Sequence, residues 1–272
     1  MRTADGGPSG AFAEVPGARL WFVDTRNGDV PVVLLHANTG TSASWHHQIA
    51  AFAKAGYRVI AFDRRGWGKS VAVPASGPQP GTIATDLDAL ADHLDLPSFH
   101  LVAVAGGTFA ALDYAAWQPE RVRSLVAAVS MGAVQEPEIR DFVARIEIPT
   151  LRAQSALYRE VGPSFRGADP EGTRRWVDQY KSARQPDAIM QPMRTPNTFA
   201  KLATISAPTL VVAGGADLIA PPALMRLWSA HIPGHEWAIV PEAGHSIAQE
   251  TPAQFNEIVL AFLDKHTAKN GG

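Results

Sequence analysis

Five short apolar runs, separated by stretches of helical length, constrain the fold of this chain more than any other feature. Each run is rich in Val, Leu and Ile, and it is apolar at successive positions rather than at alternate ones. Such runs are typical of parallel strands whose two faces are both covered by helices. The runs occupy residues 31–36, 57–62, 99–104, 124–130 and 208–214.

The stretches between the runs favour helices. Residues 85–94 space their leucines at helical period with acidic residues on the other face, and residues 107–117 and 252–266 follow similar patterns. Strands that alternate with helices indicate an α/β fold with a mostly parallel sheet and helices on both faces. Residues 11–24 alternate in polarity and follow Gly and Pro, which predicts an antiparallel hairpin at the edge of the sheet.

Residues 134–201 break this rhythm, because they contain no strand-like run and carry nine arginines. They are either a solvated helical excursion or a lid. The segment leaves after one predicted parallel strand and returns before the next, at the sheet edge where open α/β sheets bind ligands. We therefore expect an inserted helical cap over residues 134–201, with residues 1–133 and 202–272 forming the core.

Composition excludes several classes of protein. The 24 basic and 26 acidic residues give a net charge of −2, which argues against a nucleic-acid partner. The chain has no cysteine, so disulfides, thiolate nucleophiles and cysteine-based metal sites are excluded. No apolar run approaches the roughly 18 residues of a membrane span, and the first ten residues lack the apolar core of a secretory signal. We expect a cytoplasmic protein with no membrane partner.

Two loops near the end of the chain predict a paired acid and base. His245 lies in the sequence PEAGH, directly after a predicted strand over residues 236–240, and is well placed to act as a general base. Asp217 lies in GGAD after the preceding strand. A carboxylate there would bond to the other imidazole nitrogen and stabilise the imidazolium.

The sequence AVAGG after residues 99–104 has the form of a nucleophile elbow, a sharp turn between strand and helix. The residue at its tip is Ala105, which has no nucleophilic atom. HANTG, which begins at His36, stands where an oxyanion loop belongs, so the backbone N–H groups of Asn38 and Gly106 would face a developing negative oxygen. DRRGWGKS is not a phosphate loop, because Asp63 replaces the glycine that motif needs.

These motifs resemble those of the α/β-hydrolase fold family, and the similarity covers nearly all of the chain except the cap. The resemblance implies an eight-stranded, mostly parallel sheet and the family's chain order of elbow, acid and base. It implies that His245 is the triad base, Asp217 its acid, and the amides of Asn38 and Gly106 the oxyanion hole. Ala105 departs from the pattern at the nucleophile position, and Ala37 and Ala103 replace customary glycines.

Ala105 leaves three functions open. The first is hydrolysis of an ester, a lactone or a carbon–carbon bond beside a carbonyl, either in a Ser→Ala variant or by a route that needs no serine. The second is a cofactor-free lyase, decarboxylase or isomerase that uses His245 as general base. The third is a receptor for a small ligand. No cofactor motif and no metal-ligand spacing is found, and the oligomeric state is not indicated.

The predicted substrate is a small molecule with a carbonyl group. Arg64, Arg65 and the cap arginines are expected at the same edge of the sheet as the site. An arginine that points into the pocket would select an anionic substrate. The alternative is that these arginines are solvated or paired with acids. The pocket would then be apolar and shaped by five side chains, those of Phe142, Tyr158, Phe165, Trp176 and Met190.

Overall fold

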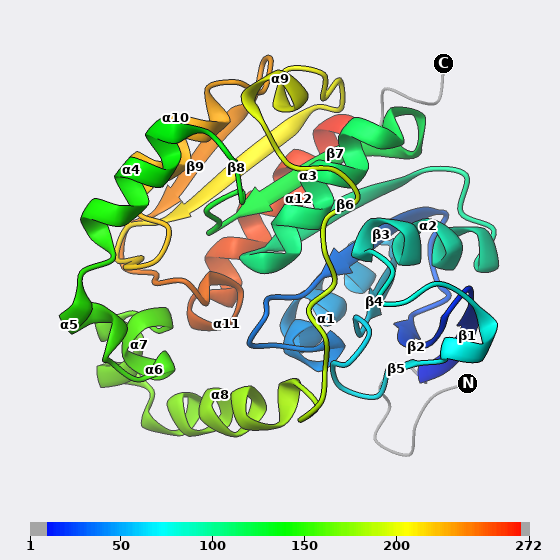
Figure 1. Ribbon diagram of the computed structural model, residues 1–272, viewed down its shortest axis with the longest axis horizontal. Helices are drawn as coiled ribbons and strands as arrows, with labels where there is room; N and C mark the ends of the chain where they lie inside the picture. Colours follow the sequence, from blue (N-terminus) through cyan, green and yellow to red (C-terminus); the bar gives the residue numbers. More distant parts are fainter. Residues whose placement is uncertain (1–9, 268–272) are drawn as a thin grey trace.

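A computed structural model describes residues 10–267, which form one sheet between two layers of helices (Figure 1). Six neighbouring strands are parallel, and an antiparallel hairpin closes one edge, as predicted. A ninth, two-residue strand, β5 (Val71–Ala72), pairs with the hairpin. In spatial order the other strands are β1 (Gly10–Val15), β2 (Ala18–Asp24), β4 (Tyr57–Phe62), β3 (Val30–Leu35), β6 (Phe99–Val104), β7 (Val122–Ala128), β8 (Thr209–Gly214) and β9 (Glu236–Val240).

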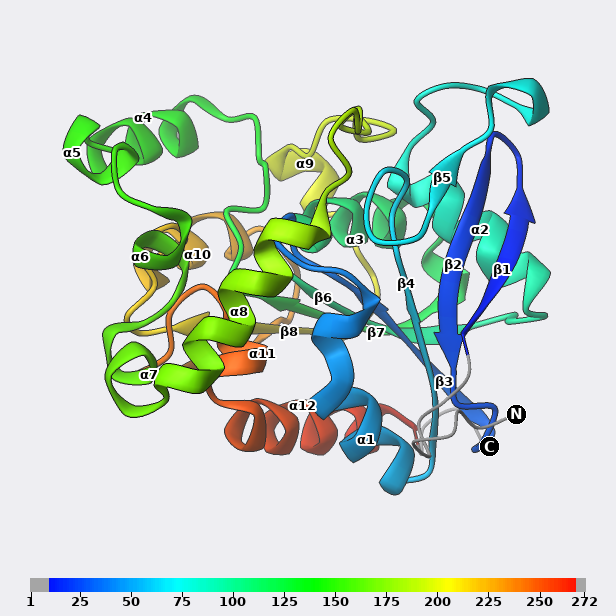
Figure 2. The same cartoon turned by 90° about the horizontal axis from the view of Figure 1, so that it is seen from below.

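Helices cover both faces of the sheet, which confirms the predicted fold class. One face carries α1 (His46–Lys54), α11 (Ile247–Glu250) and α12 (Pro252–Thr267), and the other carries α2 (Ile83–His93), α3 (Gly106–Trp117) and α10 (Pro222–Ser229). Figure 2 shows α1 and α12 below the sheet and α2 and α3 above it. Three 3-10 turns, η1 (Ser42–Trp45), η2 (Pro74–Ser76) and η3 (Pro119–Arg121), join these elements.

The two helical layers explain why the strands are apolar at every position. Along β3, Val33 and Leu35 join the apolar core on the α2 and α3 side, whereas Val32 and Leu34 join the core on the α1 and α12 side. Successive side chains of a strand point to opposite faces, so both sets are buried. None of the helices within residues 10–267 combines the length and apolarity that crossing a membrane requires.

A helical segment lies between β7 and β8. It contains α4 (Pro137–Ile146), α5 (Pro149–Arg152), α6 (Ala156–Glu160), α7 (Pro163–Ala168), α8 (Pro170–Ala183) and α9 (Phe199–Leu202). Four of these helices begin with proline, whose fixed φ suits the first helical position and whose missing N–H is not needed there. Many short helices therefore follow one another in a stretch that is poor in apolar runs.

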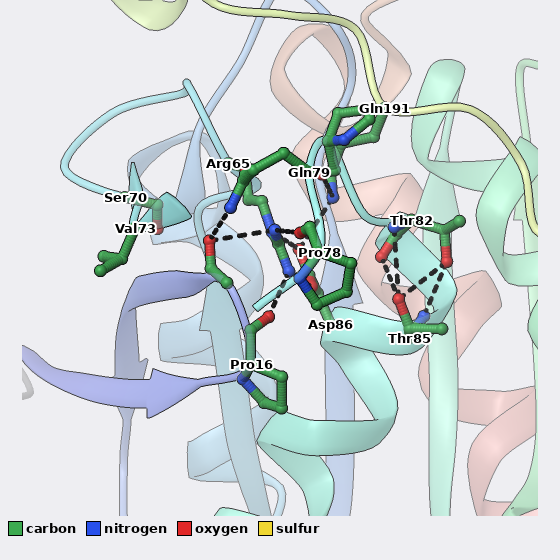
Figure 3. Close-up of polar contacts among 12 residues, drawn as sticks. Pro16, Arg65, Ser70, Val73, Pro78, Gln79, Thr82, Thr85, Asp86 and Gln191 are labelled. Atoms are coloured by element: carbon green, nitrogen blue, oxygen red, sulfur yellow. Dashed lines mark hydrogen bonds and ion pairs between the residues drawn. The ribbon is translucent and has the colours of Figure 1, made fainter. Parts of the chain in front are cut away.

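The loop after β4 is fixed by Arg65, whose five N–H donors all have acceptors (Figure 3). Two of these bonds form a buried, bidentate ion pair with Asp86 of α2, with distances of 2.6 and 2.8 Å. The other three go to the carbonyl oxygens of Pro16, Gly17 and Pro78. This one side chain joins the hairpin, the loop before α2 and α2 itself.

Candidate active site

His245 and Asp217 form a buried pair. His245 Nδ1 lies 2.8 Å from Asp217 Oδ2, and both side chains are less than one-tenth exposed. The backbone N–H groups of Ile219 and Ala220 donate to the other oxygen, Asp217 Oδ1, at 2.8 and 2.9 Å. Asp217 is therefore held rigidly while it orients the imidazole. Nε2 of His245 has no hydrogen-bond partner within residues 10–267, so it is the nitrogen free to exchange a proton.

Ala105 sits at a sharp turn between β6 and α3, with φ 49° and ψ −121°. A positive φ is strained for any residue with a Cβ. The turn is held by the Ala105 N–H, which donates to the Ala128 carbonyl at 3.0 Å, and by Ser130 Oγ, which donates to the Ala105 carbonyl at 2.8 Å. The backbone of a nucleophile elbow is thus present, although the side chain at its tip is a methyl group.

Close packing around the turn requires glycine on its helical side. A Cβ at Gly107 would lie 2.5 Å from the Leu35 carbonyl oxygen, and a Cβ at Gly106 would lie 2.5 Å from Asn38 Oδ1. The second distance shows that the Asn38 amide group packs directly on Gly106. Within residues 10–267, neither the Asn38 N–H nor the Gly106 N–H has an acceptor. The two predicted oxyanion donors therefore lie in neighbouring segments and are both unoccupied by protein groups.

Two further carboxylates act on His245. Glu160, at the end of α6, accepts a hydrogen bond from Thr39 Oγ1 at 2.8 Å, and its carbonyl oxygen accepts from the Ser246 N–H. Glu250 accepts from the N–H groups of Gly162, Gly244 and Ser246 at 2.8 to 2.9 Å. Burial acts to lower the pKa of His245, but the charges of Asp217, Glu160 and Glu250 outweigh it and raise that pKa above its ordinary value.

The hydroxyl groups near the elbow are committed to structure. Thr108 is fully buried, and its Oγ1 faces the Ala128 carbonyl at 3.4 Å. The Ser130 hydroxyl donates to Ala105 and accepts from the Gly132 N–H. Neither serves as a substitute nucleophile in this arrangement.

Small cavities adjoin the site. One of about 30 Å³ lies between the oxyanion loop and the His245 loop, and its walls include Thr39, Val104 and His245. A second, of about 50 Å³, is lined by residues that include Arg64 and Gly106. By volume each holds only a few water molecules.

The matches to known proteins agree with this geometry. A sequence profile described as alpha/beta hydrolase fold matches residues 30–252, which is most of the chain. The chain belongs to the α/β-hydrolase fold family. The predicted family is confirmed.

Relatives of this α/β hydrolase are enzymes. A 2-hydroxy-6-oxononadienedioate/2-hydroxy-6-oxononatrienedioate hydrolase of Burkholderia vietnamiensis is 29% identical over 277 residues, spanning 90% of this chain and 91% of the relative. The solved structure of a thermophilic esterase from Thermogutta terrifontis has a TM-score of 0.79 at 25% identity, covering 94% and 99% of the two chains. An N-acyl homoserine lactone degrading enzyme has a TM-score of 0.74 at 26% identity, covering 93% and 100%. The predicted class, a hydrolase of this family, is confirmed.

Glu160 and Glu250 are not among the site residues that the sequence predicts. Glu160 lies in the segment between β7 and β8, where no strand marks the register, and its bond to Thr39 spans 121 positions of sequence. The only available signal for Glu250 was its position five residues after His245. Trp176, by contrast, was a predicted pocket residue, and it is buried with its Nε1 donating to Ser246 Oγ at 2.8 Å. Tyr158 and Met190 are both more than two-fifths exposed.

Proposed function

We propose that this α/β hydrolase cleaves an ester, a lactone or a carbon–carbon bond beside a carbonyl, with water as the nucleophile. The observation that carries the proposal is the complete His245–Asp217 pair next to an elbow whose tip is Ala105. Within residues 10–267, a base oriented in this way has no hydroxyl group of the protein to activate. Water bound beside Nε2 is the remaining nucleophile.

The reaction proceeds in two steps. His245 Nε2 removes a proton from water as the water oxygen attacks the substrate carbonyl, and the resulting oxyanion accepts hydrogen bonds from the amides of Asn38 and Gly106. When the tetrahedral intermediate collapses, His245 returns the proton to the leaving oxygen or carbon. Asp217 stabilises the imidazolium between the two steps. General base catalysis supplies roughly 10²- to 10⁴-fold, so we expect an activated substrate.

Ala105 also favours a second candidate, in which no nucleophile is needed. His245 would remove a proton from the carbon next to the carbonyl, and the same two amides would hold the enolate. A lyase or an isomerase would use this step, whereas a decarboxylase would form the same enolate by loss of CO₂ and would then accept a proton on that carbon. This route differs from hydrolysis in its product, because no water is added.

The segment over residues 134–201 is proposed as a lid on the core formed by residues 1–133 and 202–272. Three hydrogen bonds support this role, since α6 and α8 contact the loops around the site through Glu160, Trp176 and Gln179. Ligand pockets usually measure about 300–1,000 Å³, far more than the cavities beside His245. Because residues 190–193 form part of the wall of the second cavity, we expect the segment to move when a substrate of that size enters. We continue to expect a cytoplasmic protein.

Three proteins and one panel of substrates test the proposed chemistry. We expect the native chain to hydrolyse an activated aryl ester or lactone, and His245→Ala to lose roughly 10²- to 10⁴-fold. Ala105→Ser should add a burst of acyl-enzyme, which shows that the elbow is competent. Activity found only after Ala105→Ser would refute water as nucleophile. Deuterium exchange at the α-carbon without hydrolysis would establish the enolate route. If neither the native chain nor Ala105→Ser is active on any substrate, the remaining function is that of a ligand receptor.

We propose in addition that the substrate is anionic. Only an arginine with a free N–H donor could bind it. Arg65 is excluded because its donors are all in use. Arg159 is the cap candidate, because it adjoins Glu160 and its buried Nε has no partner within residues 10–267. The name of the Burkholderia relative specifies a dioate, a dicarboxylate. A ligand acid should bind more tightly than its methyl ester by at least about 1 kcal/mol, less so at high salt. Equal affinities would contradict this proposal.

A further inference from the structure

Arg64 is a buried cation without an acidic partner. It is 2% exposed, and within residues 10–267 it forms no ion pair, in contrast to its neighbour Arg65. Its guanidinium makes two hydrogen bonds and lies 4.5 Å from the ring of Trp67, while the buried Nε has no acceptor. Burial lowers the pKa of Arg64 to about 9, so the side chain still carries its charge at neutral pH. An uncompensated buried charge is costly, so the groups that Arg64 contacts must stabilise it.

Both hydrogen bonds end on the oxyanion loop. Arg64 Nη2 donates to the Ala37 carbonyl oxygen at 3.1 Å, and Nη1 donates to Asn38 Oδ1 at 3.0 Å. The Ala37 carbonyl belongs to the same peptide group as the Asn38 N–H, one of the two predicted oxyanion donors. The cation therefore binds the back of the peptide whose front is aimed at the substrate.

The same carbonyl oxygen has two neutral donors as well. His36 Nδ1 lies 2.7 Å from it, and the Gly40 N–H donates to it at 3.1 Å. The Arg64 backbone N–H donates to His36 Nε2 at 3.1 Å, which places the imidazole proton on Nδ1. Burial, reinforced by the charge of Arg64, holds the pKa of His36 well below its usual range. His36 is thus a neutral donor, and Arg64 supplies the only charge among these three.

We propose that Arg64 is a positioning residue that makes the oxyanion hole cationic. It withdraws electrons through the Ala37–Asn38 peptide, and hydrogen bonds linked through one group strengthen one another by about 10–30% each. It also fixes the Asn38 side chain with Oδ1 toward the guanidinium, so Nδ2, on an exposed residue packed against Gly106, becomes a third donor. The inference rests on the proposed function for its oxyanion. It adds that the site prefers ligands whose oxygen bears a full negative charge.

A phenol probe tests the charge without any turnover. We would titrate bound 4-nitrophenol by its phenolate absorbance in His245→Ala, which removes the general base, and in the native chain. A cation behind the Ala37–Asn38 peptide favours the phenolate over the phenol, so the pKa of bound 4-nitrophenol should fall by about 1 unit, the lower end of the range for a nearby charge, in both proteins. Because no reaction occurs, the result is independent of whether the chain is a hydrolase.

Variants of Arg64 and of Arg184 distinguish the effect of Arg64 through the Ala37–Asn38 peptide from the effect of any nearby positive charge. Arg64→Met should abolish the shift. Arg184→Met is the matched control, because exposed Arg184 lies over the same Trp67 ring at 5.5 Å but does not contact the loop, and it should retain the shift. Arg64→Lys keeps the charge but has one donor group, so it should retain only part of the pKa shift. This variant provides the test if Arg64→Met fails to fold. The proposal is overturned if the native chain shows no shift, or if the Arg64 variants match the native chain.

Discussion

At the scale of single residues, His245 is defined by the charges around it. Three carboxylates outweigh the effect of burial and raise its pKa, yet a general base must be neutral to accept a proton. Activity that depends on His245 should therefore rise with pH through a value above the ordinary 6.5. An NMR titration of the imidazole checks this without a substrate. A midpoint below 6.5 would contradict it.

Variants of the carboxylates refine this prediction. Glu160→Gln removes one of the charges that raise the pKa of His245, so both the titration midpoint and the pH profile should move to lower pH. Asp217→Asn should in addition lower the plateau rate by roughly 10²- to 10⁴-fold, and no more than His245→Ala does, because the imidazole loses its orientation. Arg152→Met alters only an exposed ion pair with Glu147 and serves as a control.

Most predicted site residues could be found in the sequence because each lies in a short motif directly after a strand. Asp217, His245 and Ala105 are examples, since strand order alone brings such loops to one edge of the sheet. The different environments of Arg64 and Arg65 could not be predicted. The two are adjacent and identical in type, and only the direction of each side chain decides which one reaches Asp86.

At the scale of elements, Arg65 and Asp86 connect three segments and should dominate local stability. Removing one partner of a buried ion pair leaves an uncompensated charge and costs about 3–5 kcal/mol. Arg65→Met should therefore lower the free energy of unfolding by that amount in a urea titration, and adding Asp86→Leu should recover much of the loss. Arg19→Met is the control, because its pair with Glu14 is at least half exposed and contributes less than about 1 kcal/mol. A similar loss in Arg19→Met and Arg65→Met would contradict the prediction.

Elements with a strong local signal were predicted closely. β4, β6 and β9 have the expected bounds, and α3 begins one residue earlier than expected, at Gly106. The strand predicted over residues 124–130 lies two residues earlier, as β7 (Val122–Ala128). Its last predicted residues, including Val129 at φ 41°, turn toward the elbow instead. The sequence does not predict the helices α4 to α8 one by one, because several of them are shorter than two turns and leave no periodic pattern.

At the scale of the whole molecule, His100 connects the middle of the sheet to the C-terminal helix α12. It lies in β6, where Nδ1 contacts Ser124 Oγ of β7 at 2.7 Å and Nε2 contacts Thr267 Oγ1 of α12 at 3.1 Å. Burial, together with the nearby charge of Arg123, lowers the pKa of His100 to about 4. A base with a lowered pKa binds its proton more tightly when unfolded, so stability falls as pH drops from about 6.5 toward 4.

Replacing His100 should remove part of this acid sensitivity. His100→Gln is expected to be less stable at pH 7, because the hydrogen bonds change, but to lose less stability between pH 6.5 and 4 than the native chain, by at least about 1 kcal/mol. Urea titrations at several pH values measure the difference. His46→Gln, on the exposed side of α1, should follow the native curve. Parallel curves for His100→Gln and the native chain would refute the prediction.

Glu250 limits which segments can replace the one between β7 and β8. Its carboxylate accepts hydrogen bonds from two parts of the chain. One donor is the N–H of Gly162, in the segment between β7 and β8, and the others are the N–H groups of Gly244 and Ser246, beside His245. A Cβ at Gly162 would lie 2.6 Å from Glu250 Oε2 and 2.9 Å from the Gly244 backbone nitrogen, so a side chain there would displace the carboxylate or the base loop. The segment proposed as a lid is therefore tied to the core at this position. We expect a chimera with another segment between β7 and β8 to keep its base loop intact only if the new segment places a glycine opposite Glu250, which remains with the core.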